Sequence, residues 1–207
     1  MASRFQVDSH KTTTSHEHHT PGETPHHPQD HPVRATSCNR SLTPGEGLRI
    51  GETLGLRRED LHLLPDSRAL GCTIAGAHVH VRRRLNDNGA LAKSHYPRSV
   101  PVGTQTVDAY RDYQYERDRL VPDSGCDFVF VNLYWSTAPD TAMKYPNTRS
   151  CLTRVARRAG VQARLHMLRH TAGTAWVRSG TPIDVVQKLM GHQSPVSTAK
   201  YLHPPTS

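Results

Sequence analysis

The C-terminal part of the chain carries side chains whose types and order suit phosphoryl transfer. His166 and Arg169 are three residues apart, the dipeptide Gly191-His192 follows, and Tyr201 comes nine residues after His192. An arginine offers a planar fork to phosphate oxygens, a histidine transfers protons near neutral pH, and a tyrosine oxygen is a nucleophile. Because these residues occur in one order within a short span, we predict a phosphoryl-transfer site with Tyr201 as the nucleophile.

The spacing of His166 and Arg169 places both side chains on one face of an expected helix, where they can address a single phosphate together. His170 is expected to point elsewhere. Taken alone, the pair could equally be part of the N-terminal cap region of a helix, with the arginine solvated. The rest of the chain must therefore supply partners for these two side chains.

Two upstream segments offer such partners. Arg49 is a charge in an otherwise apolar helix start, and Glu52 three residues later could hold its guanidinium in position. The alternative is an ordinary surface ion pair. Lys93 is expected on the return strand of a β-hairpin, where it could donate a proton to a leaving oxygen, or could simply protect the strand edge from aggregation.

Composition indicates a polyanion as the first partner to consider. The 207-residue chain has 26 Lys and Arg against 18 Asp and Glu, a formal net charge of +8 and a pI near 9.6. Such a charge attracts nucleic acid, although a basic surface without that role remains an alternative. No apolar signal segment or membrane span of about 20 residues is present, so we expect a cytoplasmic protein that does not enter the membrane.

The cysteines indicate no metal site. Cys38, Cys72, Cys126 and Cys151 are scattered, without a CxxC pair. This pattern predicts neither a zinc ribbon nor a disulfide scaffold.

The pattern of apolar residues predicts a polar tail followed by an α+β domain. Residues 1–46 lack any periodic apolar face and are predicted to be a disordered tail rich in His, Pro and Thr. Its histidines could bind transition metals weakly, but a plain polar tail is the favoured interpretation. The seven histidines of this segment are His10, His16, His18, His19, His26, His27 and His31.

The domain is predicted to be mostly helical with a small antiparallel sheet. Alternating β-branched residues and an Asn-Asp-Asn-Gly turn predict a hairpin, and glycine stops mark several helix ends. The last short helix is expected to carry Tyr201. The predicted helices are 47–56, 104–120, 147–159, 165–179 and 183–192, and the predicted strands are 60–64, 72–85 and 90–102.

These segments together resemble a known family. The chain from Gly47 to His203 is similar to the catalytic domain of the tyrosine recombinases, the phage-integrase type of site-specific DNA strand-exchange enzymes. The resemblance rests on four segments in the family's order. They are GLRIGETLGL with Arg49, AKSHYPRSVPV with Lys93 and Arg98, HMLRHTAGT with His166 and Arg169, and LMGHQSPVSTAKYLH with His192 and Tyr201.

The resemblance implies site-specific DNA recombination or integration through a covalent intermediate. Tyr201 would form a 3′-phosphotyrosyl bond, Arg49 and Arg169 would hold the non-bridging oxygens, and Lys93 would protonate the leaving 5′-oxygen. His166 and His192 would assist proton transfer and phosphate binding, and Glu52 would steady Arg49. No metal and no cofactor would be needed. The partner would be double-stranded DNA, bound by a homo-tetramer. Further arginines are candidates for contacts with the DNA backbone, namely Arg82, Arg83, Arg84, Arg154, Arg157 and Arg158.

The N-terminal side departs from the family pattern. Family members usually carry a helical DNA-clamping domain and an apolar helix before the first arginine, whereas Pro44 and Gly45 would interrupt such a helix here. We therefore expect 47–207 to be a catalytic domain that is partial at its N-terminus, with Arg49 weakly supported. Two alternatives remain open: a degenerate mobile-element remnant that binds DNA without catalysis, and a basic DNA-binding regulator.

Overall fold

The computed structural model describes residues 46–134, 138–194, 196–199 and 201, all within one unit of the chain, 31–207. Except for Glu46, the tail predicted over 1–46 lies outside the described residues. Glu46 itself is buried, and the hydroxyl of Thr106 donates to its carboxylate.

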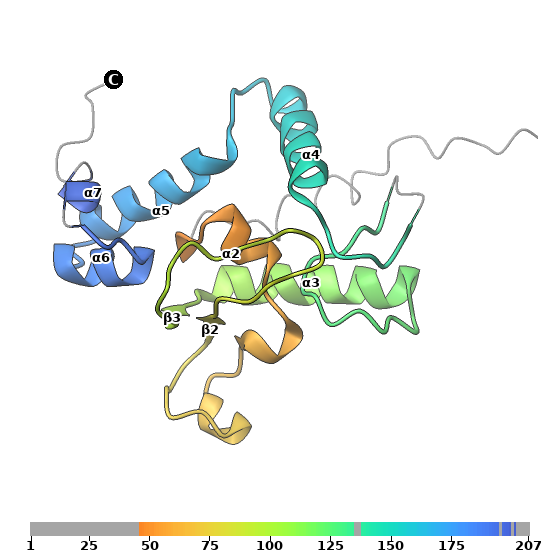
Figure 1. Cartoon of the computed structure of the whole chain (residues 1–207), viewed down its shortest axis with the longest axis horizontal. Coiled ribbons are helices and arrows are strands. Elements are labelled where there is room, and N and C mark those ends of the chain that lie inside the picture. Colours follow the sequence, from red (N-terminus) through yellow and green to blue (C-terminus); the bar gives the residue numbers. More distant parts are fainter. Residues whose placement is uncertain (1–45, 135–137, 195, 200, 202–207) are drawn as a thin grey trace, which may run out of the picture. The chain divides into compact units, whose positions relative to one another are not determined.

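Helices are the predominant regular secondary structure of the described chain (Figure 1). Each predicted helix is present, and that over 104–120 has the predicted bounds, but the last short helix ends at Ala199 and does not carry Tyr201, which lies in a turn. Glycines with positive φ follow three of them, at Gly160, Gly180 and Gly191, since this backbone conformation ends a helix with little strain in glycine. None of the described helices has the length and apolar character needed to cross a bilayer. The helices are α2 (Ile50–Leu54), α3 (Thr104–Leu120), α4 (Tyr145–Arg158), α5 (Leu165–Arg178), α6 (Ile183–Met190) and α7 (Val196–Ala199).

A small antiparallel sheet and two 3-10 turns accompany the helices. The strands are β1 (Leu61–His62), β2 (His78–Val81) and β3 (Arg98–Pro101), in the order β1-β2-β3. The turns are η2 (Arg58–Asp60) and η3 (Ser67–Leu70). The predicted fold class, a mostly helical α+β domain with a small antiparallel sheet, is confirmed.

The hairpin is present, but its strands are shorter than predicted, and Lys93 does not lie on the return strand. Pairing between β2 and β3 ends at Val81 and Arg98, and the connection 82–97 leaves the sheet. It passes so close to α2 that a Cβ at Gly51 would stand 2.5 Å from the carbonyl oxygen of Leu91. Contact with α2 therefore replaces strand pairing here, and Lys93 is placed beside that helix.

Three apolar clusters hold these elements together. The first joins Leu54 and Leu56 to α3 and the segment 128–131, and the second joins β2 to β3 through Val79, Val81 and Val100. The third is Val186, Met190 and Tyr201 beside α5. Because side chains alternate across a strand, Val79 and Val81 face the core while the histidines of β2 occupy the opposite face.

A buried arginine ties α3 to the segment that follows it. The side chain of Arg117 is fully buried and donates to the carbonyls of Phe128 (2.7 Å) and Cys126 (2.6 Å) and to the hydroxyl of Ser124 (2.6 Å). Its guanidinium also forms an ion pair with the carboxylate of Asp140, at 3.4 Å. A guanidinium offers several fixed donors, so one side chain satisfies carbonyls that have no strand partner.

Replacing Arg117 by methionine should lower the free energy of unfolding by about 3 kcal/mol or more, because several buried acceptors lose their donor. Denaturant unfolding followed by circular dichroism measures the change. The matched control is Arg111→Met on the same helix, where the arginine is exposed and pairs with Asp108. The control should shift stability by less than about 0.5 kcal/mol, and equal effects of the two substitutions would contradict this role of Arg117.

Candidate active site

A buried carboxylate organises the arginines of the site. The Glu52 side chain is fully buried and lies 3.1 Å from Arg49, 2.8 Å from Arg98 and 3.9 Å from Arg169. Burial raises the pKa of Glu52, but the hydrogen bond and charge of Arg98, followed by those of Arg49, outweigh it and leave the pKa below its usual value. Glu52 is therefore ionised and joins α2, β3 and α5.

Arg49 is held by its own helix and by α6. It is the N-cap of α2, and Glu52 at the third helical position accepts from its backbone N–H at 2.8 Å, as in a capping box. The guanidinium donates to Glu52 and to the carbonyls of Met190 and Gly191, both at 3.3 Å. The expectation that Arg49 is weakly supported is wrong, because Glu52 and two backbone carbonyls hold its guanidinium.

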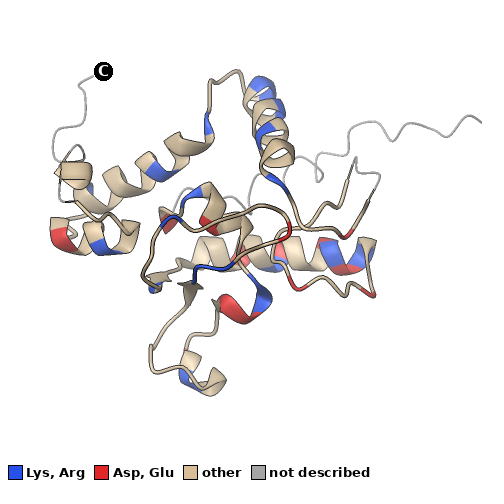
Figure 2. Cartoon of the chain, viewed as in Figure 1, with Lys and Arg blue, Asp and Glu red and all other residues tan. Residues whose placement is uncertain are grey.

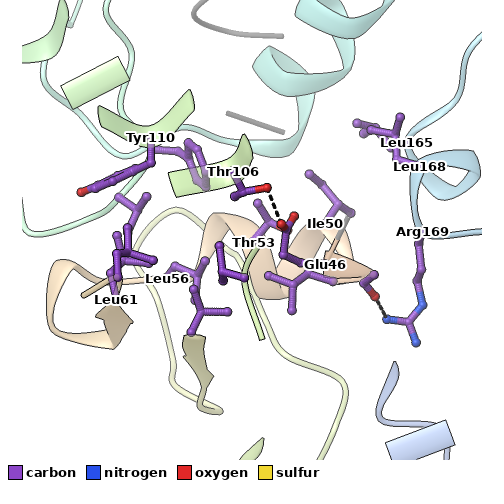
Figure 3. Close-up of a pocket in the computed structure, with 17 residues that line it drawn as sticks. Glu46, Ile50, Thr53, Leu56, Leu61, Thr106, Tyr110, Leu165, Leu168 and Arg169 are labelled. Atoms are coloured by element: carbon purple, nitrogen blue, oxygen red, sulfur yellow. Dashed lines mark hydrogen bonds between the residues drawn. The ribbon is translucent and has the colours of Figure 1, made fainter. Parts of the chain in front are cut away.

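Arg169 sits between two backbone carbonyls and an apolar cavity. Its guanidinium donates to the carbonyls of Gly47 and Met190, and the side chain is 11% exposed. Figure 3 shows it at the side of a cavity lined by residues such as Ile50 and Leu168. Burial, with the positive charge of Arg49, lowers the pKa of Arg169 to about 10. The arginines around Glu52 thus carry more positive charge than its single carboxylate neutralises, which favours a bound anion.

Arg98 belongs to this cluster, although the sequence did not single it out as a site residue. Its guanidinium forms a two-point contact with the Glu52 carboxylate, at 2.8 and 3.1 Å, and its Nε donates to the carbonyl of Leu189 at 2.9 Å. Gly191 packs on it, since a Cβ there would lie 2.9 Å from the guanidinium carbon. Its place in the same motif segment as Lys93 was the one available signal.

Four of the predicted residues line one groove. Arg49, Lys93, His166 and Arg169 come from three separate segments and border an open groove of about 960 Å³ between α2, α4, the 82–97 connection and the start of α5. Lys93 and His166 are exposed. The groove is therefore a cationic surface with proton donors, which suits a phosphate better than a metal ion.

Two further arginines of this groove were missed from the sequence. Arg149 on α4 and Arg164, the N-cap of α5, are both exposed and line it. Figure 2 shows basic residues along α4 and no acidic ones. The basic character of α4 was visible in the sequence, but the face turned to the groove was not.

Tyr201 and His192 do not line the groove. Tyr201 is 3% exposed and packs with Val186 and Met190, and its ring is stacked on that of His192 at a centroid distance of 6.3 Å. Burial raises the pKa of Tyr201, and the charges of Arg169 and Arg49 partly offset this increase. Tyr201 is thus close enough to the arginines for their charges to affect its pKa, yet its side chain is covered.

Tyr201 packs where α5 has no side chain, and His170 lies beside it. A Cβ at Gly173 would stand 2.9 Å from the tyrosine ring, so glycine makes room for it. The ring centroid of His170 lies 5.5 Å from that of Tyr201 and 6.1 Å from that of His166, although His170 was expected to point away from the site. His192 is oriented by Thr198, whose hydroxyl oxygen lies 2.9 Å from Nδ1.

The arginines proposed from the sequence as DNA contacts occupy different environments. Arg84 is engaged by the buried carboxylate of Asp60 at 2.7 and 2.8 Å, and Arg82 lies 3.7 Å from the same group. Arg83 is exposed and contacts the ring of His95. The guanidinium of Arg84 is therefore occupied by its ion pair with Asp60, whereas the side chain of Arg83 remains accessible to solvent.

The three arginines proposed on α4 lie outside the groove lining. Arg157 and Arg158 are exposed, and Arg154 borders a separate pocket with Asn147. Helical spacing explains the difference, because Arg149 shares the groove-facing side with Leu152 and Thr153.

Comparison with known proteins identifies the family. The profile of the phage integrase family matches residues 28–207, and the chain belongs to that family. Transposase A from transposon Tn554 of Staphylococcus aureus is 31% identical over 163 residues, which are 76% of this chain and 40% of the relative. The tyrosine recombinase XerC of Listeria monocytogenes serovar 1/2a is 30% identical over 163 residues, 77% of this chain and 46% of the relative. The chain thus spans less than half the length of either relative.

Solved structures share the fold. XerA recombinase superposes with a TM-score of 0.60 at 23% identity, covering 83% of this chain and 56% of that one. The Tn1549 transposon integrase in complex with transposon right end DNA superposes with a TM-score of 0.61 at 19% identity, covering 86% and 57%. The described arrangement is therefore that of a tyrosine recombinase catalytic domain.

Replacing Glu52 by glutamine should lower the free energy of unfolding at neutral pH by about 3 kcal/mol, because three buried guanidinium groups lose their counter-charge. The folded pKa of Glu52 is depressed, so its contribution is complete above about pH 4.5 and is lost as the pH falls through that lower pKa. The difference between wild type and variant should therefore shrink toward about pH 3. Urea unfolding across this range measures it.

The control is Glu59→Gln, which removes an exposed carboxylate that pairs with Arg84 at 2.6 Å. Its effect should stay below about 1 kcal/mol. A Glu52→Gln effect that does not change with pH would rule out the ionised carboxylate as the organiser of the cluster.

Proposed function

We propose that this chain cleaves and rejoins double-stranded DNA by site-specific recombination, with Tyr201 as the nucleophile. The observation that carries the proposal is the convergence of Arg49, Lys93, His166 and Arg169 on one groove, with Tyr201 behind it. These side chains come from segments that are distant in the sequence. Neutralising and positioning a phosphodiester is the main requirement of such a transfer, and this set meets it.

In the proposed reaction each of these groups has one role. The Tyr201 hydroxyl gives its proton to His166 or His192 as its oxygen attacks the scissile phosphorus, a 3′-phosphotyrosyl bond forms, and the bond from phosphorus to the 5′-oxygen breaks. Lys93 gives a proton to the leaving 5′-oxygen, while Arg49 and Arg169 stabilise the non-bridging oxygens. A 5′-hydroxyl from a second strand reverses these steps and rejoins the DNA.

Cleavage requires Tyr201 to leave its covered position. Met190 and Gly191, whose carbonyls bind the two arginines, immediately precede the segment that carries His192 and Tyr201. A phosphate in the groove competes with these carbonyls for the same guanidinium N–H groups. DNA binding would thus loosen the contacts of this segment, so that Tyr201 becomes available when the substrate is present.

The assembly belongs to the same proposal. Strand exchange needs two DNA duplexes and four tyrosines, so a homo-tetramer on DNA would be the working form. XerH site-specific recombinase has been solved bound to its difH substrate, with a TM-score of 0.58 and 19% identity, covering 83% of this chain and 43% of that one. That likeness supports the fold on which this proposal rests.

A DNA duplex with a nick beside the cleavage site traps the covalent intermediate and tests the chemistry directly. Wild-type protein should form a protein–DNA adduct on denaturing gels, and Tyr201→Phe should form none because it lacks the nucleophilic oxygen. Arg169→Gln should slow adduct formation at least about 100-fold, since one donor to the developing charge is lost. Random-sequence libraries provide the substrate while the natural site is unidentified.

Tyr115→Phe is the matched control, because Tyr115 is an exposed tyrosine on α3 outside the groove. It should form adduct at the wild-type rate. Salt-dependent binding without any adduct would support a degenerate remnant that only binds DNA, and the loss of binding at low salt would exclude a role on DNA altogether.

Arg149 and Arg164 should contact the DNA backbone. Arg149→Gln and Arg164→Gln should each weaken binding across all sequences and reduce the slope of log K against log salt by about 1, because one phosphate contact is lost. Fluorescence anisotropy over a range of salt concentrations measures both quantities. Arg111→Gln, an exposed arginine on α3, should leave the slope unchanged, and an equal change in all three variants would indicate a net-charge effect without local contacts.

A further inference from the structure

A cluster of histidines and a cysteine lies on the face of the sheet opposite the apolar core. His62 on β1, His78 and His80 on β2, and Cys72 in the connection between these strands place their ligand atoms within 4.8 Å of one another. Within the described part of the chain, this is the one group of three or more such residues with metal-binding spacing. It takes no part in the proposed recombination chemistry.

The sheet register explains how the histidines meet. His78 and His80 are two residues apart on β2 and share a face, and His62 pairs directly with His78 across the antiparallel ladder. The ring centroids of the three histidines are 4.5 to 5.0 Å apart. Cys72 reaches them because the connection folds back over the same face.

The distances between the ligand atoms match a tetrahedral metal ion. The Nε2 atoms of His78 and His80 are 3.1 Å apart, and the Cys72 sulfur lies 3.4 Å and 3.6 Å from them. With typical bonds to Zn²⁺, tetrahedral geometry separates two nitrogens by about 3.3 Å and a nitrogen from a sulfur by about 3.6 Å. One ion of that size therefore fits between these three atoms.

The outer hydrogen bonds orient the rings toward this centre. The Nδ1 of His78 donates to the carbonyl of Gly76 at 2.9 Å, which leaves a lone pair on Nε2. The Nδ1 of His80 lies 3.1 Å from the hydroxyl of Ser99, its partner on β3. The Nδ1 of His62 is buried without a hydrogen-bond partner among the described residues. His78 and His80 thus have the combination of an inward nitrogen and an outward partner that is characteristic of metal-binding histidines.

In the connection between β1 and β2, Leu63 and Ala77 at the two ends pack against the apolar core, but the stretch 64–76 between them lacks an apolar anchor. Its large apolar residues Leu64, Leu70 and Ile74 are 43%, 49% and 39% exposed. Its buried residue is Ser67, whose hydroxyl donates to the carbonyl of Gly76 at 2.8 Å. A connection of this kind needs a different anchor, and a metal ion would supply one.

We propose that His62, Cys72, His78 and His80 bind one Zn²⁺ ion, which fixes the connection 63–77 to the sheet. A thiolate and three imidazoles are ligands that Zn²⁺ prefers, and four protein ligands make a closed structural site. No zinc site was predicted from the sequence, because it contains no CxxC pair. The cluster escaped that test because three of its four ligands are histidines and only the sheet register brings them together.

Titration of the chelator-treated full chain with Co²⁺ tests the site. One equivalent should give the intense visible bands of tetrahedral cobalt and a near-ultraviolet band from the thiolate ligand, and Zn²⁺ should displace it. Cys72→Ser should lose the thiolate band and weaken Zn²⁺ binding at least about 100-fold. Cys126→Ser is the matched control, since Cys126 is also a free, half-buried thiol, and should retain both properties.

Ser99→Ala tests the outer contact without removing a ligand. It should weaken Zn²⁺ binding about 10-fold while keeping the thiolate band, because only the orientation of His80 is affected. The histidine-rich tail could bind cobalt through nitrogen alone. Cobalt binding without a thiolate band, or a thiolate band that survives Cys72→Ser, would therefore overturn the proposal.

Limited trypsin digestion of wild-type protein provides a test that does not depend on folding of a variant. Arg68 is an exposed residue of the connection, and Zn²⁺ should slow cleavage after it at least about 10-fold relative to the chelated protein. Mass spectrometry identifies the cleavage site. Equal cleavage rates with and without Zn²⁺ would show that no ion anchors this connection.

Discussion

The ionised carboxylate of Glu52 is the interaction on which the site depends. It is buried among the guanidinium groups of Arg49, Arg98 and Arg169, which come from the start of α2, from β3 and from α5. Burial of an arginine is costly unless the charge is paired, so one carboxylate makes it possible for three to converge. The remaining positive charge is what an incoming phosphate would neutralise.

The same arginines connect the groove to the covered tyrosine. Their donors reach the carbonyls of Met190 and Gly191, where α6 ends and the segment carrying Tyr201 begins. Gly191 adopts a left-handed conformation there, and its lack of a side chain admits Arg98. The end of α6 therefore links the arginine cluster to the segment that carries Tyr201.

The two faces of the small sheet carry different groups of residues. Valines of β2 and β3 pack into the core on one face, and the histidine and cysteine cluster occupies the other. Alternation along a strand allows both to be built from the same four residues of β2. The helices could be predicted from glycine stops and apolar spacing because these are local properties. Strand bounds could not, because pairing ends where the connection 82–97 leaves the sheet to contact α2.

The sequence by itself determined the helices, the α+β class and the residue types of the site, because motif spacing and helix signals depend on neighbours along the chain. Tertiary structure alone decided which of these residues meet. It brought Arg98 to Glu52 and Arg149 to the groove, and it covered Tyr201. These outcomes depend on contacts between distant segments, whose energies come from burial and charge pairing. No local sequence pattern predicts these contacts.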